Sequence, residues 1–167
     1  GSAAAASRAC SSWNCRCTSR WRARGRQELQ ALEAAAADPA VDRVLVKNIN
    51  PGAALLRVAS LTLRADLALA EGRPADAVPL LIEATALEDG LRYDEPHLWL
   101  APTRHALGDA CLAAGQPVRA EQAYREDLEH YPGNGWSLTG LANALQARGQ
   151  GAASEVEMAS VLAVVAK

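Results

Sequence analysis

The sequence predicts an all-α protein built from helical hairpins, and three observations support this. Apolar residues make up 50% of the chain, but they are mainly alanine and leucine, and phenylalanine does not occur. Alanine and leucine are strong helix formers, whereas sheets are rich in β-branched and aromatic residues. From residue 53 onward the helical patterns are separated by short breaks that contain glycine or proline. Two of these breaks, at Gly115 and Gly149, are 34 residues apart, the length of one helix-turn-helix repeat.

The elements are expected in a simple order. A helix is predicted over 27–37, because this segment is rich in helix-forming residues and ends at Asp38-Pro39. The segment VDRVLVKNINPG, residues 41–52, could form a short strand, but a lone strand has no partner, so a turn or an irregular link is expected. Short connections then indicate antiparallel pairs. Six helices are predicted, at 53–71, 75–88, 98–114, 118–130, 135–148 and 152–166.

The best-patterned repeat covers residues 101–134. Small residues occur where two helices must approach closely, and a large ring stands where it can fill the gap beside them. The pattern is Arg104-x₂-Leu107-Gly108-x₂-Cys111, then Ala120-x₃-Tyr124, then Pro132. It resembles the tetratricopeptide repeat (TPR), whose signature is W-x₂-L-G-x₂-Y, A-x₃-F and P. In the TPR register, the residues expected to be buried are Leu107, Gly108, Cys111, Ala120 and Tyr124.

The resemblance extends over about residues 53–166, with looser repeats on either side of the central one. It implies a solenoid of about three TPR-like hairpins, with atypical outer repeats as in other short arrays. The segments at 49–59, 86–96 and 123–145 are similar to the C-terminal portion of a group of bacterial TPR proteins. That similarity implies a scaffold, and it transfers no enzymatic activity.

Charge separates a basic start of the chain from an acidic body. Residues 1–26 hold six arginines and no acidic residue, so the remaining 27–167 carry a balance of −8 within a net charge of −2. We interpret 1–26 as a basic extension rich in Arg, Ser and Cys, and its opening Gly1-Ser2 is typical of an expression-tag scar. Residues 27–52 are assigned to a capping helix and linker, and 53–167 to the repeats.

The same charges bear on partners and location. The apolar runs are interrupted by charged residues, so no membrane span is expected, and a cytoplasmic location is favoured. Nucleic-acid binding would rest on the basic extension alone, because the acidic body repels phosphate, and we expect it not to occur.

Candidate chemistry is sparse. We expect no cofactor and no catalytic residues, since no nucleophile and base occur at an informative spacing. Cys10, Cys15 and Cys17 do not have the paired spacing of a zinc site. A metal or small-ligand site in this segment, or in the acidic insertion around Glu88 and Asp94, remains the alternative to a non-enzymatic scaffold for a peptide or partner helix.

The TPR register implies which residues would face a partner. Places 2, 5, 9 and 12 of each first helix line the concave face in this family, and none of them is Lys or Arg here. The chain therefore lacks the cations with which carboxylate-clamp members hold chaperone tails, and a neutral or basic segment is expected instead. A groove that is merely solvated is an equal alternative. The candidate partner-binding residues are Asp66, His105, Asp109, Leu112, Trp136 and Asn143.

The last predicted helix, 152–166, has apolar residues around most of its circumference. A terminal repeat normally turns a polar face outward, and an exposed apolar patch usually marks an interface. We therefore expect self-association through 152–166, or docking of the basic extension there.

Overall fold

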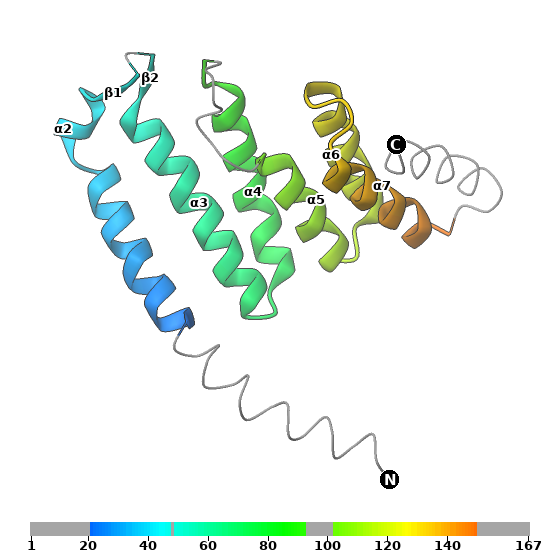
Figure 1. The fold of residues 1–167 in the computed structure, drawn as a ribbon. Coiled ribbons are helices and arrows are strands. Elements are labelled where there is room, and N and C mark those ends of the chain that lie inside the picture. The colour runs from blue at the N-terminus through cyan, green and yellow to red at the C-terminus, as the bar shows by residue number, and fades with distance from the viewer. Residues whose placement is uncertain (1–20, 48, 93–101, 150–167) are drawn as a thin grey trace, which may run out of the picture.

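The computed structural model describes residues 21–47, 49–92 and 102–149, and these form an all-α fold (Figure 1). After a helix over 21–36 come α2 (Pro39–Asp42) and a small hairpin of β1 (Leu45–Val46) and β2 (Asn50–Pro51). The remaining elements are α3 (Gly52–Ala70), α4 (Pro74–Asp89), α5 (Thr103–Ala113), α6 (Pro117–His130) and α7 (Gly135–Ala147).

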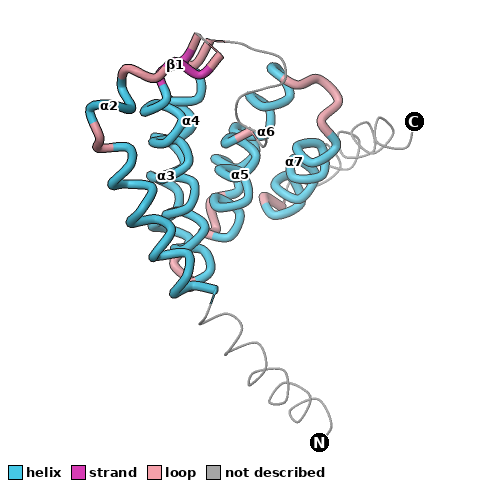
Figure 2. Tube along the Cα trace, turned by 60° about the vertical axis from the view of Figure 1, so that its left-hand side comes forward, coloured by secondary structure: helices cyan, strands magenta, loops and turns pink. Residues whose placement is uncertain are grey.

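Helices α3 to α7 pack in sequence order. The closest packing is between α3 and α4, α5 and α6, α6 and α7, and α4 and α5. Figures 1 and 2 show the resulting row of antiparallel helices, with the helix over 21–36 lying along α3. The array of helical hairpins expected from the sequence is confirmed, and α3 to α7 begin and end within two residues of the expected bounds except at the start of α5. The predicted helix at 152–166 lies outside the described residues.

The two hairpins have the same turn. Gly72 and Gly115 have φ of 75° and 70°, a left-handed conformation that glycine adopts without a steric penalty. Each is followed two residues later by a proline at the start of the next helix, Pro74 of α4 and Pro117 of α6. Proline suits that position because its missing N–H would have no partner inside the helix. The turn residues therefore fix where each second helix begins.

The link before α3 differs from the expectation. Residues 45–46 and 50–51 form an antiparallel pair with Leu45 opposite Pro51, so the expectation of a turn without strands was wrong. The chain folds back on itself and supplies its own partner strand. Asn50 then ties this hairpin to the end of the first helical pair, since its amide donates to the Arg92 carbonyl oxygen (2.9 Å) and its Oδ1 accepts from the Arg92 N–H (2.8 Å).

The helix expected at 27–37 is longer in the structure, where residues 21–26 are helical as well. Two arginines of this added turn reach α3. Arg22 donates to the carbonyl oxygen of Ala70 (3.1 Å), and Arg26 pairs with Glu71 (2.7 Å). The helix thus lies along α3, and its role as a cap stays a prediction. No helix of the described ranges is both long and apolar enough to cross a membrane.

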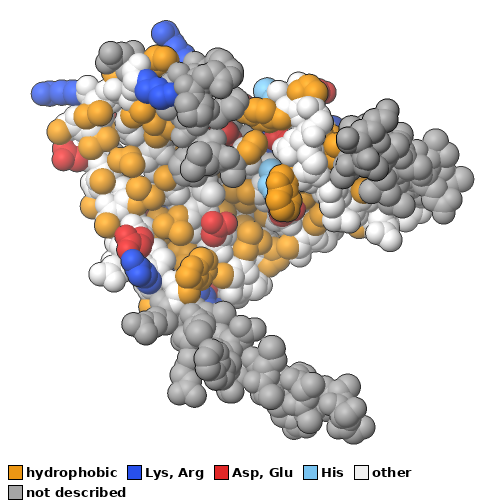
Figure 3. Space-filling model, viewed as in Figure 1, with side chains coloured by type: hydrophobic (Ala, Val, Ile, Leu, Met, Phe, Trp, Pro, Cys, Tyr) orange, Lys and Arg blue, Asp and Glu red, His pale blue; other side chains and the backbone are white. Residues whose placement is uncertain are grey.

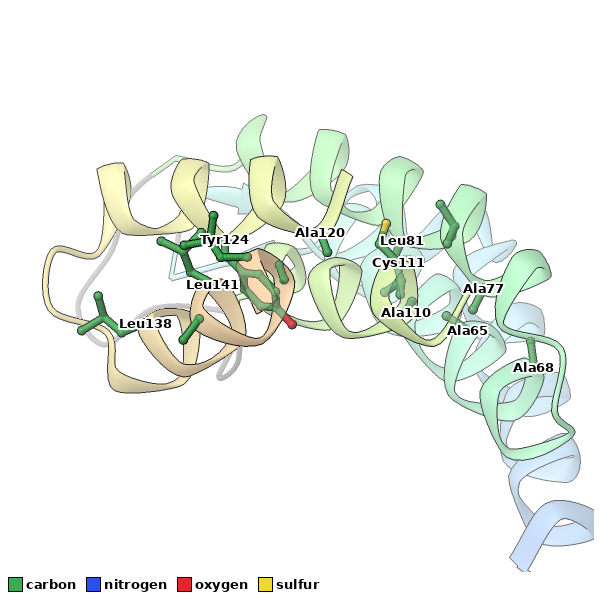
Figure 4. Close-up of a cluster of buried hydrophobic side chains, with 14 residues drawn as sticks. Ala65, Ala68, Ala77, Leu81, Ala110, Cys111, Ala120, Tyr124, Leu138 and Leu141 are labelled. Carbon is green, nitrogen blue, oxygen red and sulfur yellow. The ribbon is translucent and has the colours of Figure 1, made fainter. Parts of the chain in front are cut away.

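The core runs between the hairpins and is lined largely by small residues (Figure 4). Alanines at the helix contacts let the backbones approach closely, and one large ring, Tyr124, fills the space near α7. Gly108, Cys111, Ala120 and Tyr124 are buried, as the repeat pattern predicted. Leu107 is only partly buried, contrary to the expectation, because it packs against the edge of this core.

Candidate functional site

Tyr124 connects the core with the surface of the first helices. Its side chain starts on α6 and lies between α5 and α7, where only glycine leaves room for the ring. A Cβ atom added at Gly108 would come within 2.4 Å of the ring, and one added at Gly140 within 2.3 Å. The phenolic hydroxyl is buried with the ring and donates a hydrogen bond to Asp109 Oδ1 (2.5 Å). Burial and the neighbouring Asp109 carboxylate both raise the pKa of Tyr124, so its hydroxyl keeps the proton that it donates.

His105 lies between this hydroxyl and carboxylate on one side and an exposed tryptophan on the other. Its Nε2 atom is 3.7 Å from Asp109 Oδ2, one helical turn away on α5. Its ring centroid is 6.3 Å from that of Tyr124 and 6.0 Å from that of Trp136, the second residue of α7. We call His105, Asp109, Tyr124 and Trp136 the aromatic-acid cluster. Figure 3 shows histidine and acidic side chains beside exposed hydrophobic ones on this face.

A buried polar network positions Trp136. Asn134 caps α7, since its Oδ1 accepts from the Trp136 N–H (3.2 Å). Its amide donates to Asp127 Oδ2 (2.8 Å), and the Ser137 hydroxyl donates to the same oxygen (2.5 Å). Asp127 is fully buried. The start of α7 is therefore fixed to α6, and the indole of Trp136 projects outward with 75% of its surface exposed.

The structure brings together three of the six candidate partner-binding residues. His105, Asp109 and Trp136 belong to the aromatic-acid cluster. Leu112 is half-buried against the core, and Asn143 is exposed on α7. Tyr124 was predicted only as a core residue, and no signal in the sequence indicated that its hydroxyl also belongs to this site. The sequence analysis also missed Asn134, although an asparagine before a helix signals an N-cap.

Asp66, the remaining candidate, lies on α3. Its side chain reaches the surface, yet surrounding protein partly desolvates the carboxylate and raises its pKa. It forms no hydrogen bond or ion pair with the other residues that the structure describes. A carboxylate in this situation costs stability when it is ionised, because burial disfavours the charged form.

This pKa shift predicts how stability depends on pH. A folded-state pKa above the unfolded value means that ionised Asp66 destabilises the fold at neutral pH. We expect Asp66→Asn to raise the melting temperature at pH 7, and the gain to vanish as the pH falls below the ordinary carboxylate value of 3.8. Thermal unfolding followed by circular dichroism would measure this. Glu129→Gln, at an exposed position of α6, is the control for loss of one charge. A lower melting temperature for Asp66→Asn at pH 7 would contradict the prediction.

The acidic residues at the end of α4 have structural partners. Glu88 Oε2 accepts hydrogen bonds from the Thr103 N–H (2.8 Å) and hydroxyl (2.5 Å), so it caps α5. Asp89 forms a two-pronged pair with Arg104, with both contacts at 2.6 Å. The described residues contain no group of three His, Cys, Asp or Glu side chains suited to a metal ion. Cys10, Cys15, Cys17 and Asp94 lie outside those residues.

A hollow of about 330 Å³ lies between α4 and α6, with α5 as its floor. It is lined by apolar side chains such as Ile82 and Leu107 and by the guanidinium groups of Arg104 and Arg119. Cys111 also borders it, and burial raises the pKa of this thiol, which makes it a poor nucleophile. Arg104, one of its polar lining residues, is already paired with Asp89.

Comparison with known proteins agrees with the repeat pattern. Residues 56–132 match the family model of the tetratricopeptide repeat. This span begins in α3 and ends just after α6, so it covers both hairpins, while α7 follows it. No curated protein and no solved structure was found to match the chain.

Proposed function

We propose that this chain, which belongs to the tetratricopeptide repeat family, is a non-enzymatic scaffold that binds a peptide segment or a partner helix on its concave face. Repeats of this family generally mediate interactions between proteins. In the TPR register the first helices of the hairpins, here α3 and α5 followed by α7, line the concave face. The aromatic-acid cluster belongs to α5 and α7, apart from Tyr124, whose hydroxyl reaches it from α6.

The exposed indole of Trp136 is the observation that carries this proposal. Tryptophan residues are enriched among the side chains that dominate the binding energy of protein interfaces. Trp136 is more exposed than any other large hydrophobic side chain that the structure describes. Its position is also fixed in advance by the Asn134 cap, so a partner would not have to immobilise the backbone beneath it. Burying this ring would therefore contribute strongly to binding.

The alternative function, a metal or small-ligand protein, has less support. Glu88 and Asp89 of the acidic insertion are engaged with α5, as described above. That alternative now depends on the cysteines of the basic extension and on Asp94 of the acidic insertion, all of which lie outside the described residues. Self-association through residues 152–166 stays a prediction, as does the absence of nucleic-acid binding.

Selection from a random peptide library displayed on phage tests the proposed scaffold function. Peptides that bind the chain should lose at least about tenfold in affinity with Trp136→Ala, because this change removes the anchor of the concave face. Val118→Ala is the matched control, since Val118 is also an exposed apolar residue, 63% accessible, but lies at the start of α6. Fluorescence anisotropy with labelled peptides would give the dissociation constants.

Two results would contradict the proposal. One is that selected peptides bind Trp136→Ala as tightly as the original chain, and the other is that Val118→Ala weakens binding more than Trp136→Ala does. Either result would place the interaction away from the concave face. Circular dichroism of both variants, recorded beside the binding data, ensures that a lost affinity does not come from lost helix.

A further inference from the structure

We propose that the aromatic-acid cluster recognises an arginine side chain within a segment of a partner protein. The guanidinium would lie against the indole of Trp136 and pair with the carboxylate of Asp109. This inference rests on the proposed function, and it names the chemistry that the concave face would select.

The Asp109 carboxylate has neither an arginine nor a lysine partner among the described residues. Its Oδ1 accepts the Tyr124 hydroxyl, a neutral donor, while its Oδ2 faces His105 at 3.7 Å, too far for a hydrogen bond. The side chain is 58% exposed, so Oδ2 is open to a ligand. A guanidinium would supply the charge-assisted hydrogen bond that this oxygen lacks.

Two acidic side chains of the second helices show the contrast. Asp89 is paired with Arg104, and Glu121 with both Arg125 and Arg148. These two carboxylates, on α4 and α6, are thus neutralised by arginines of the chain itself. On the first helices, Asp109 of α5 and Asp66 of α3 have no such partner among the described residues. At the concave places of the TPR register these two carboxylates have no Lys or Arg beside them, which favours a basic segment.

Trp136 supplies the second half of the recognition. Both Trp136 and Asp109 are neighbours of His105, which places an exposed aromatic face and a carboxylate at the same site. The planar guanidinium stacks on aromatic rings and forms paired hydrogen bonds with carboxylates, whereas the ammonium of lysine acts as a compact point charge. The cluster is therefore suited to arginine more than to lysine.

A double-mutant cycle tests this pairing directly. The probe is a selected peptide that contains arginine, and its matched form carries citrulline, which keeps the shape but has no charge. With the original chain, citrulline should weaken binding by about tenfold, and lysine should weaken it as well. With Asp109→Asn the citrulline effect should shrink to about twofold or less, because the carboxylate that it depends on is gone. Glu129→Gln, which removes the same charge from α6, should keep the tenfold effect.

The outcomes separate this inference from the proposed function. Peptides that depend on Trp136 but bind equally well with arginine or citrulline would refute arginine recognition and leave the scaffold function standing. An equal citrulline effect in the original chain and in Asp109→Asn would also refute the pairing. Peptide binding that does not depend on Trp136 at all would refute both arginine recognition and the proposed scaffold function. If the chain self-associates and Asp109→Asn abolishes this association, the arginine belongs to a second copy of the chain. The proposal of a separate partner protein would then be wrong.

Discussion

Tyr124→Ala is expected to lower the free energy of unfolding by about 3–5 kcal/mol, the range for removing a large ring from a packed core. The Tyr124 side chain is fully buried and fills the space between α5 and α7. The glycines at 108 and 140 cannot close the resulting cavity, because they have no side chains to move into it. Urea unfolding followed by circular dichroism would measure the loss.

Tyr124→Phe is the control for the hydroxyl. It keeps the ring and removes only the hydrogen bond to Asp109, so a loss of about 1 kcal/mol is expected. A loss below about 1 kcal/mol for Tyr124→Ala would mean that this ring does not hold the two hairpins and α7 together. The same comparison shows whether the ring or the hydroxyl carries the stability.

Gly140→Ala is expected to lower the free energy of unfolding by at least about 2 kcal/mol. This is opposite in sign to the usual effect of replacing glycine by alanine inside a helix. Alanine in the interior of a helix is normally better than glycine by about 0.5–1 kcal/mol. At this position the added methyl group would lie 2.3 Å from the Tyr124 ring, closer than carbon atoms can approach. Because the ring is also held by Gly108 on its other side, α7 would have to move away.

Gly135→Ala provides the matched control for Gly140→Ala. Gly135 lies at the start of the same helix, and nothing lies within 4 Å of a Cβ atom added there. The change should be neutral or stabilising by up to about 1 kcal/mol. In a Tyr124→Leu background the penalty of Gly140→Ala should shrink, because the two residues are in contact and their effects do not add. Equal penalties in both backgrounds would show that the clash is not with this ring.

The sequence by itself determined the repeated hairpins, because their signals are local. Gly72 and Gly115 permit the left-handed turn, and a proline two residues later begins the next helix. The spacing of small and large residues placed Tyr124 in the core, since a helical period fixes which side chains share a face. The resemblance to the tetratricopeptide repeat depended on this same spacing, and the family match over residues 56–132 confirms it.

Only the tertiary structure decided how the candidate site is assembled. The hydroxyl of Tyr124 reaches Asp109 across 15 residues of sequence, and His105 meets Trp136 across 31. The pairing of β1 with β2 and the partial burial of Leu107 also escaped the sequence pattern. A periodic pattern tells which face of a helix is buried, but it does not tell which polar atoms of neighbouring helices meet at the edge of that face. Those contacts depend on how closely the helices approach, and here Gly108 and Gly140 set that distance by leaving room for a single ring.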